Sequence, residues 1–129
     1  MNYFRKKGTK YNNTIIEVDG IKFHSKAEAK RYTELKLLEK AKVIKDLKLQ
    51  PKYTLQDKFI KNGKNYRKIE YIGDFEYIEN GIKIIEDVKS VITAQDKYFG
   101  LKKKMLLKII GDDVIFRENI YQKGIINDY

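Results

Sequence analysis

Apolar residues recur with two different periods along the chain, and the period of each segment predicts its secondary structure. Residues 16–23 alternate apolar and polar side chains on both sides of Asp19-Gly20, a turn dipeptide, which predicts a short hairpin. Ser25 is then a good N-cap residue, and the helical spacing that follows predicts a helix over about 25 to 42. The apolar positions of this helix are Ala27, Tyr32, Leu35, Leu38 and Ala41.

Extended structure is expected in the middle of the chain. Residues 43–61 hold two apolar stretches separated by Pro51, the only proline. Because proline is excluded from interior strand positions, we expect the chain to bend there. After a polar turn at residues 61–65, the pattern predicts one long strand that reaches about Ile78.

A second helix and a final strand are expected in the C-terminal part. Thr93 is the predicted N-cap, Asp96 follows three residues on, and Gly111 ends the helix. A short strand over 114–116 then precedes a polar tail. The apolar stripe that we expect to face the core contains Ala94, Tyr98, Leu101, Met105 and Ile109.

The composition agrees with one small globular domain. At 129 residues, 42% hydrophobic and 36% charged, the chain suffices for a single core. We expect a flexible basic arm at 1–13 and one α/β domain at 14–129, with helices flanking a central mixed sheet. No apolar run approaches a membrane span, and the opening segment lacks the apolar core of a signal peptide. We therefore expect a cytoplasmic protein with no membrane partner, in the host cytoplasm if a phage encodes it.

Charge and missing residue types narrow the chemistry. The absence of Cys excludes disulfides, zinc-thiolate sites and thiol catalysis, and a single His excludes a histidine metal cluster. The formal net charge of +10 favours a polyanionic partner, and nucleic acid is the leading candidate. A biased genome composition would also enrich Lys, Ile and Asn, so charge alone leaves both interpretations open.

An acidic hairpin carries the candidate chemistry. Asn80-Gly81 favours a two-residue turn into a strand over 82–89, and counting outward from that turn places Asp74 opposite Asp87. Opposed carboxylates repel each other unless a cation compensates them, and magnesium prefers such oxygen ligands. Lys89 lies two residues beyond Asp87, on the same face of the strand.

These three groups meet the needs of phosphodiester hydrolysis. A metal polarises the phosphate and activates a water, while a neighbouring cation offsets transition-state charge. The alternative is a solvated salt-bridge face, which the apolar residues Ile84-Ile85 and Val88 argue against, because unpaired acids in a buried strand are expensive. Glu86 falls on the opposite face and is the weaker ligand candidate; Glu76 shares the face but pairs with Ile85.

The sequence resembles the PD-(D/E)XK nuclease superfamily through an Asp, a hairpin and Asp87-Val88-Lys89 between two helices. Residues 15 to 108 also resemble a phage and prophage family catalogued as a domain of unknown function. That similarity rests on Asp19-Gly20-Ile21, Phe23, Ser25-Lys26, Glu28-Ala29, Arg31-Tyr32, Leu38-Glu39-Lys40-Ala41, Gln50-Pro51, Asp74-Phe75 and Glu86-Asp87-Val88-Lys89. The resemblance implies a restriction-endonuclease-like core in the order helix, three strands, helix, strand (αβββαβ).

The resemblance also implies roles for individual residues. Asp74 and Asp87 would hold Mg²⁺, for which Mn²⁺ would substitute, the Val88 carbonyl would be a third ligand, and Lys89 would be the catalytic lysine. In related junction-resolving endonucleases a Glu on the first helix completes the site, and Glu28 matches that position. Ser25-Lys26-Ala27-Glu28 is equally a capping box, in which Glu28 only bonds back to the Ser25 amide. Both roles stay open.

Three further positions bear on the resemblance. Gly73 stands where the superfamily label has Pro, at a position that varies. On the second helix, Lys102 and nearby Gln95 occupy places where the superfamily often puts polar groups that contact DNA or the site. For Lys102 the alternative is a lysine that lays its stem along the apolar stripe and keeps its ammonium in water.

The sequence therefore predicts a magnesium-dependent DNA endonuclease of the phage type, acting on branched or junction DNA in recombination or replication. Two alternatives remain: a DNA-binding module of nuclease-like fold without catalysis, and a phage inhibitor of a host enzyme. Because nucleases that cut two strands symmetrically are commonly dimers, a homodimer is also an open alternative.

Overall fold

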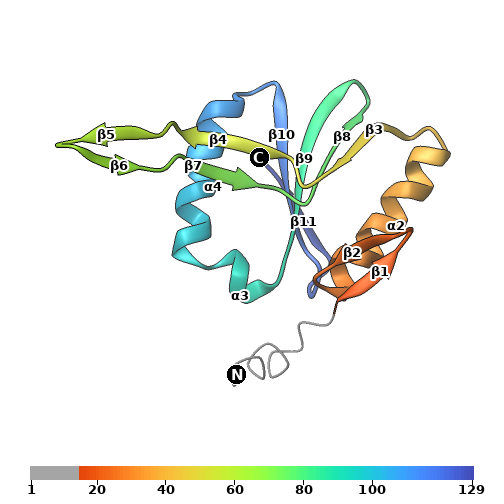
Figure 1. Ribbon diagram of the computed structural model, residues 1–129. Helices are drawn as coiled ribbons and strands as arrows, with labels where there is room; N and C mark the ends of the chain where they lie inside the picture. The colour runs from red at the N-terminus through yellow and green to blue at the C-terminus, as the bar shows by residue number, and fades with distance from the viewer. Residues whose placement is uncertain (1–14) are drawn as a thin grey trace, which may run out of the picture.

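The computed structural model describes residues 15–129, and its centre is a five-stranded mixed sheet (Figure 1). The strand order is β11-β10-β9-β8-β3; β9 and β10 run parallel, and the other neighbours are antiparallel. The α/β class with a central mixed sheet is thus confirmed, and the arm expected at 1–13 lies outside the described residues. The strands are β3 (Ile44–Leu49), β8 (Phe75–Glu79), β9 (Ile82–Lys89), β10 (Val114–Ile120) and β11 (Ile125–Asp128).

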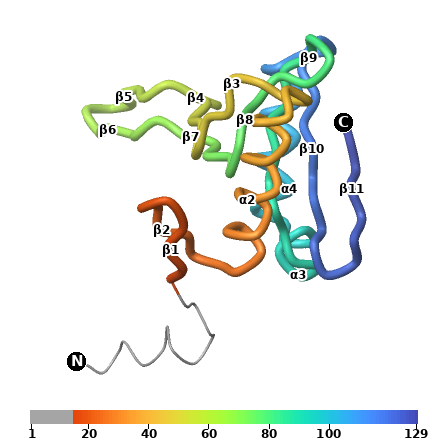
Figure 2. The backbone as a smooth tube through the Cα atoms, turned by 90° about the vertical axis from the view of Figure 1, so that its right-hand side faces the viewer, coloured from red at the N-terminus to blue at the C-terminus, as the bar shows by residue number. Residues whose placement is uncertain are grey.

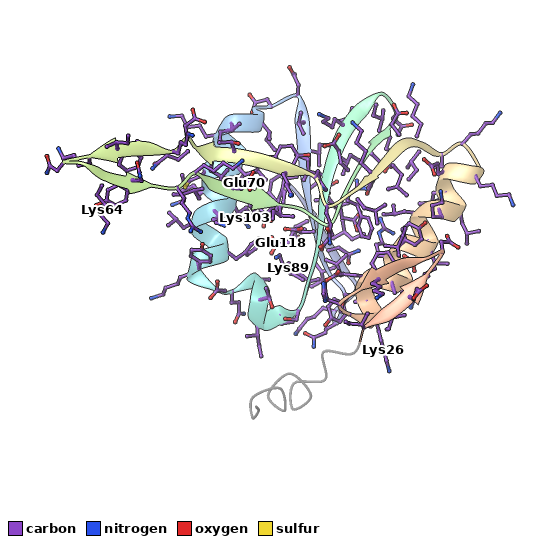
Figure 3. All side chains as sticks on the ribbon, viewed as in Figure 1. Lys26, Lys64, Glu70, Lys89, Lys103 and Glu118 are labelled. Atoms are coloured by element: carbon purple, nitrogen blue, oxygen red, sulfur yellow. The ribbon has the colours of Figure 1, made fainter. Side chains whose placement is uncertain are left out.

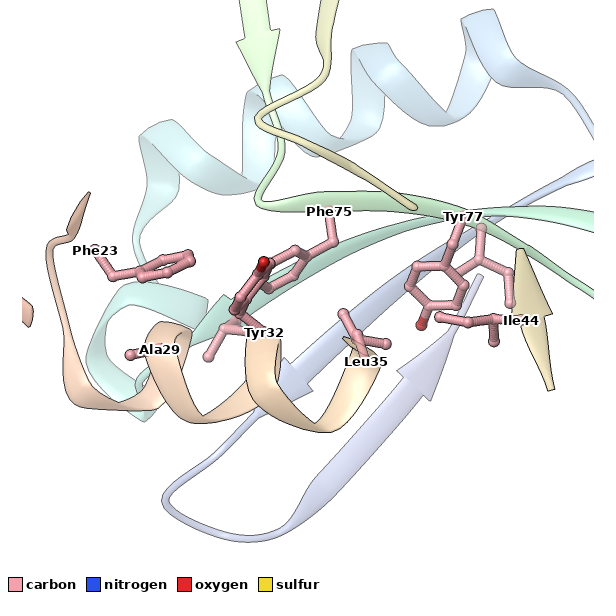
Figure 4. Close-up of a cluster of buried hydrophobic side chains, with 9 residues drawn as sticks. Phe23, Ala29, Tyr32, Leu35, Ile44, Phe75 and Tyr77 are labelled. Carbon is pink, nitrogen blue, oxygen red and sulfur yellow. The ribbon is translucent and has the colours of Figure 1, made fainter. Parts of the chain in front are cut away.

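Two helices cover opposite faces of this sheet. Helix α2 (Lys26–Lys40) begins at Ser25, as predicted, and its buried side chains meet the sheet in one apolar cluster (Figure 4). Helix α4 (Lys97–Ile110) packs on the other face in a second cluster, and α3 (Val91–Ala94) is a single turn. No helix within residues 15–129 is long and apolar enough to cross a membrane. The cluster under α2 contains Phe23, Ala29, Tyr32, Leu35, Ile44, Phe75, Tyr77, Ile84 and Val88.

The first hairpin is confirmed. Strands β1 (Ile16–Val18) and β2 (Ile21–Phe23) pair antiparallel, and both residues of the turn have positive φ, 53° at Asp19 and 77° at Gly20. Positive φ at both central residues defines the turn type that matches the twist of a hairpin. The apolar side of this hairpin packs on the cluster under α2, and the Tyr32 hydroxyl donates to Asp19 at 3.1 Å.

The single strand expected up to Ile78 is wrong. The chain instead forms three strands there, because it leaves one sheet and enters another at Gly73, whose amide donates to the Pro51 carbonyl at 2.9 Å. The first two strands belong to a two-part ribbon that projects from the body (Figures 1 and 2). The ribbon consists of β4 (Lys52–Gln56), β5 (Phe59–Lys61), β6 (Lys64–Tyr66) and β7 (Ile69–Ile72).

The second long helix starts later than expected, and it buries a neighbouring stripe of side chains instead of the expected one. Ser90 caps α3 and Asp96 caps α4, accepting from the Phe99 amide at 2.9 Å, so Thr93 is not the cap of the long helix. The buried residues of α4 are Phe99 and Leu106, not the expected stripe. Within that stripe, Tyr98, Leu101 and Ile109 are exposed. Apolar residues occupy two adjacent stripes of this helix, and the sheet receives the one containing Phe99.

The C-terminal segment is more ordered than a polar tail. Strand β10 extends to Ile120, well past the expected residue 116, and the chain returns as β11 along its outer edge (Figure 2). The Arg117 guanidinium bonds to both carboxylate oxygens of Asp128, at 2.8 and 2.9 Å, across this pair of strands. Arg117 and Asp128, which the sequence placed in a polar tail, therefore form an ion pair between the two outermost strands of the sheet.

Candidate active site on the β8–β9 hairpin

The register of the β8–β9 hairpin sets the site. Asn80 and Gly81 have φ of 54° and 78°, Glu79 pairs with Ile82, and the ladder continues to Phe75 opposite Glu86. Asp74 directly precedes β8, and its amide donates to the Glu86 carbonyl at 3.1 Å. This confirms the predicted turn and the predicted placement of Asp74 beside Asp87.

The two carboxylates are interlocked through backbone amides. The Asp74 amide donates to Oδ1 of Asp87 at 3.0 Å, and the Val88 amide donates to Oδ2 of Asp74 at 2.7 Å. Asp87 is buried, with 1% of its surface exposed, whereas Asp74 is partly exposed. Backbone donors therefore fix both side chains in position before any ligand arrives.

Lys89 completes the predicted trio. Its Nζ lies 3.6 Å from Oδ2 of Asp87 and 4.4 Å from the centre of the Phe99 ring on α4. Figure 3 shows Lys89 beside β9, on the side of the sheet that α3 and α4 cover. The side chain is 20% exposed, so the ammonium is held between an acid and an aromatic face.

The acids of this site are held near one another at an electrostatic cost. Burial raises the pKa of Asp74 well above its ordinary value, and the negative charges of Asp87 and Glu28 raise it further. Burial also raises the pKa of Asp87, against the opposing effect of the Lys89 ammonium. A cation bound between these carboxylates would relieve both effects.

Glu28 lies close enough to belong to the same cluster. It sits in the first turn of α2 and lines a pocket of about 220 Å³ together with Gln50 and Asp74. Burial raises the pKa of Glu28, His24 and the Ser25 hydroxyl oppose the rise, and the charge of Asp87 adds to it. The Ser25 hydroxyl accepts from the Glu28 amide at 3.1 Å, so the backbone of Glu28 takes part in the helix cap, while its side chain lines the pocket with Asp74. The structure leaves both roles available to Glu28.

The donor set suits a hard divalent cation. Asp74 and Asp87 offer carboxylate oxygens, and Mg²⁺ is commonly held by one or two carboxylates with waters and substrate oxygens. Oδ1 of Asp87 and Oδ2 of Asp74 each accept one amide proton, and Oδ2 of Asp87 accepts from the Tyr71 hydroxyl, so each of these oxygens retains a second lone pair for a cation. Within residues 15–129, no group of three or more His, Cys, Asp or Glu converges as a complete metal cage. The residues therefore fit a metal shared with substrate rather than one enclosed by protein.

Sequence reasoning missed Tyr71. Its hydroxyl donates to Oδ2 of Asp87, and its ring packs edge-on against Phe116. In one unbroken strand, residues 71 and 74 would point to opposite faces, so periodicity could not bring Tyr71 to this site. The available signal was Gly73, since a glycine within a strand pattern often marks a bend or a close approach.

Gly73 is needed because the chain is crowded there. A Cβ on Gly73 would lie 3.3 Å from Cγ2 of Ile85 and 3.5 Å from Cγ of Pro51. The same Cβ would lie 3.8 Å from Oδ1 of Asp87. A glycine at this position thus has a packing reason in this chain.

An ion pair between Glu118 and Lys103 lies beside Asp87, on the neighbouring strand and on α4. Glu118 on β10 pairs in register with Asp87, is 3% exposed, and accepts from Nζ of Lys103 at 3.1 Å. Lys103 lies on α4, and its Nζ is 4.1 Å from the centre of the Tyr129 ring (Figure 3 labels Lys103 and Glu118). Sequence reasoning found neither residue, since the expected strand stopped at residue 116.

The remaining predicted site residues lie in different settings. The Val88 side chain is in the core under α2, and the proposed contact through its carbonyl stays a prediction. Gln95 is exposed at the end of α3. Lys102 does not point freely into solvent: its Nζ donates to the Glu70 carbonyl at 2.8 Å and lies 5.0 Å from the centre of the Tyr98 ring. DNA contacts by Gln95 and Lys102 also stay predictions.

Comparison with known proteins gives one family. The family whose sequence model matches is described as "Protein of unknown function (DUF1064)", and the match covers residues 8–117. No curated protein and no solved structure matched the chain.

Proposed function

This chain belongs to the DUF1064 family of proteins of unknown function, and from its site we propose that it is a metal-dependent endonuclease that hydrolyses phosphodiester bonds in DNA. The observation that carries the proposal is the juxtaposition of buried Asp87 with the partly buried Asp74 and Lys89 in a chain of net charge +10. Two adjacent acids are expensive to bury unless they serve a cation, and an excess of positive charge suits a polyanionic substrate.

The order of elements supports a restriction-endonuclease-like core. Helix α2, strands β3, β8 and β9, helix α4 and strand β10 follow one another as helix, three strands, helix, strand. β8 and β9 form the hairpin of the acidic motif, and β10 returns parallel to β9. In this proposal the projecting ribbon is an insertion between the first and second core strands.

Magnesium or manganese would be held by Asp74 and Asp87, with the Val88 carbonyl as a third ligand, whereas Glu28, which does not converge with the two aspartates as a group of three, would act from outside this ligand set. The bound metal would supply a Lewis acid that polarises the scissile phosphate. Because both acids are desolvated and lie close together, two ionised carboxylates are more stable with a divalent cation bound between them than without one.

The chain's own side chains prepare the site for that chemistry. The Lys89 ammonium, held between Asp87 and the Phe99 ring, donates hydrogen bonds to the phosphate oxygens as negative charge develops on them. Tyr71 fixes the orientation of Asp87 through its hydroxyl bond. Amides of Asp74 and Val88 hold the two carboxylates, so little reorganisation accompanies substrate binding.

A cleavage assay tests this function. The protein would be incubated with supercoiled, linear, single-stranded and four-way-junction DNA, with magnesium, with manganese, and with a chelator. We expect metal-dependent cleavage by the wild type and none by Asp87→Asn; preferential cutting of the junction would assign the substrate to branched DNA. Lys89→Ala should slow cleavage far more than it weakens metal binding. DNA binding without metal-dependent cleavage would support a non-catalytic binding module instead.

A further inference from the structure

The projecting ribbon contains the longest run of exposed residues in the described part of the chain, and that run is basic. Every residue from 56 to 68 is exposed, although β5 and β6 within that segment form a regular antiparallel ladder. This stretch contains one acid, Asp57, and five basic residues, for a net charge of +4. About a tenth of the chain thus holds four of its ten excess positive charges. The basic residues are Lys58, Lys61, Lys64, Arg67 and Lys68.

The tip of the ribbon presents an ordered surface. Phe59 pairs across the strands with Tyr66, and their rings stack with centroids 4.9 Å apart and planes inclined by 8°. Lys61 pairs with Lys64 two positions farther out, on the same face of the ribbon. Nζ of Lys64 is 5.3 Å from the centre of the Tyr66 ring (Figure 3 labels Lys64). Two ammonium groups therefore extend beyond a stacked aromatic pair that stiffens the tip.

More cations lie nearer the body. Lys58, Arg67 and Lys68 line a shallow hollow of about 640 Å³ beside the base of the tip, together with Thr54, Asp57 and Glu70. Nζ of Lys68 is 3.1 Å from Oε2 of Glu70, so one of these cations is already paired. Basic side chains therefore occur both at the tip of the ribbon and nearer its base.

The base of the ribbon is fastened to the active site. Tyr53 and Tyr71 are directly paired across β4 and β7, and their hydroxyls donate to Glu76 and Asp87 respectively. Lys102 of α4 adds a bond to the Glu70 carbonyl at 2.8 Å. A ligand that binds the ribbon is therefore held at a defined position relative to the acids.

The ribbon has the reach that a DNA substrate needs. Lys68 and Lys64 precede Asp74 by six and ten residues, or at most about 20 and 33 Å of extended chain. One turn of B-DNA spans about 34 Å, and its major groove admits a two-stranded β-ribbon. We propose that this ribbon binds the duplex within one helical turn of the scissile phosphate, with Lys61 and Lys64 contacting backbone phosphates. The inference rests on the proposed function in taking the substrate to be DNA.

Charge favours duplex DNA over a second copy of the chain as the occupant. Ile60 at the tip is 70% exposed, which would suit an apolar contact between protomers. Two ribbons of net charge +4 would however repel each other at such a contact, whereas phosphates attract them. Ile60 lies between Phe59 and Lys61 and pairs with Asn65, so the apolar surface around it is too small to outweigh that repulsion.

Binding measured without divalent metal tests the inference separately from catalysis. Fluorescence anisotropy in chelator would follow binding to a labelled duplex of about three helical turns, and to one strand of it, between about 50 and 200 mM salt. The test variant is Lys61→Gln with Lys64→Gln. The matched control is Lys40→Gln with Lys45→Gln, which removes the same charge from exposed positions on α2 and β3, across the body from the ribbon (Figure 1).

We expect the ribbon variant to bind duplex about tenfold more weakly and to lower the salt slope by about 1 to 2, while the control changes affinity by less than about threefold. Equal losses in both variants, an unchanged ribbon variant, or a loss confined to the single strand would overturn the inference. So would a wild-type dimer that the ribbon variant dissociates. Metal-dependent cleavage with ribbon-independent binding would overturn this inference alone, and ribbon-dependent binding without cleavage would overturn the proposed nuclease alone.

Discussion

Glu86 and Asp87 are neighbours in β9 and both are buried, yet they occupy opposite faces and contrasting surroundings. Glu86 is fully buried and accepts from two nitrogens of Arg31, at 2.7 and 3.0 Å, and from Asn119 at 3.1 Å. The Tyr77 hydroxyl adds a further bond. One guanidinium thus meets one carboxylate in the two-pronged geometry that satisfies both charges.

Asp87 lies instead among other acids. Asp74 is bound to it through its own amide, Glu28 lies within electrostatic range, and Lys89 is the cation at 3.6 Å. The Glu86 cluster is neutralised by the chain itself, whereas the Asp87 cluster keeps surplus negative charge. In the proposed function, burial alone does not mark the metal-binding acid; the acid whose partners leave its charge undercompensated is the one assigned to the metal.

The largest expected effect separates the two faces by activity. Asp87→Asn should lower cleavage by at least about a thousandfold while the fold and DNA binding persist, because it removes a ligand charge without creating a cavity. Initial rates on the preferred DNA substrate measure this, with Glu86→Gln as the control. Cleavage by Asp87→Asn at the wild-type rate would contradict the claim that the face with Asp87 is catalytic and the face with Glu86 is structural.

Stability should show the opposite pattern. Glu86→Gln should lower the free energy of unfolding by about 3 kcal/mol, because the Arg31 guanidinium, whose side chain is 15% exposed, would lose its charged partner. Urea denaturation measures the change, and the folded fraction should still cleave DNA. A loss smaller than about 1 kcal/mol would show that the Glu86 network contributes little to stability.

The pH dependence of stability should also distinguish the clusters. Burial raises the pKa of both Asp74 and Asp87 in the folded state, so the folded protein retains protons that the unfolded chain releases. Metal-free wild type should therefore lose stability as the pH rises from the ordinary Asp pKa of about 3.9 through the raised values. Asp74→Asn with Asp87→Asn should show a smaller loss, because only Glu28, whose pKa burial also raises, remains of the three acids. Parallel urea-denaturation profiles of the two proteins across that range would contradict the shifts.

A smaller effect resolves the two roles of Glu28. Ser25→Ala should destabilise the protein by about 1 kcal/mol, because the cap of α2 loses the acceptor for the Glu28 amide. Glu28→Gln keeps a capping side chain and removes the charge, so a metal-site role predicts a stable and inactive variant. An active Glu28→Gln variant would restrict the residue to the helix cap.

The β8–β9 hairpin was predictable from sequence because a two-residue turn fixes the register of every pair beyond it. Asn80-Gly81 sufficed to place Asp74 beside Asp87, and the period of two then put Lys89 on their face. Ser25 and the helical spacing after it likewise sufficed for α2.

Elements that depend on packing between distant segments were not predictable in this way. The alternation before Ile78 continues through the break at Gly73, where only the bond to Pro51 reveals a change of sheet. The helical period fits two neighbouring apolar stripes on α4 equally well. The apolar side chains on the facing side of the sheet determine that the stripe containing Phe99 is buried. Tyr71 reaches Asp87 only because that break reverses which face it occupies.

The central claim is that Asp74 and Asp87 form a metal site while Glu86 is structural, and a magnesium titration of the thermal midpoint tests it most directly. Metal that binds the folded state stabilises it by about 2.7 kcal/mol at a concentration 100-fold above Kd. We expect the midpoint to rise in wild type and, by a similar increment, in Glu86→Gln, and to stay constant in Asp74→Asn with Asp87→Asn. Two results together would contradict the account: a wild-type midpoint that does not respond to magnesium or manganese, and an Asp74→Asn, Asp87→Asn variant that is less stable than the metal-free wild type.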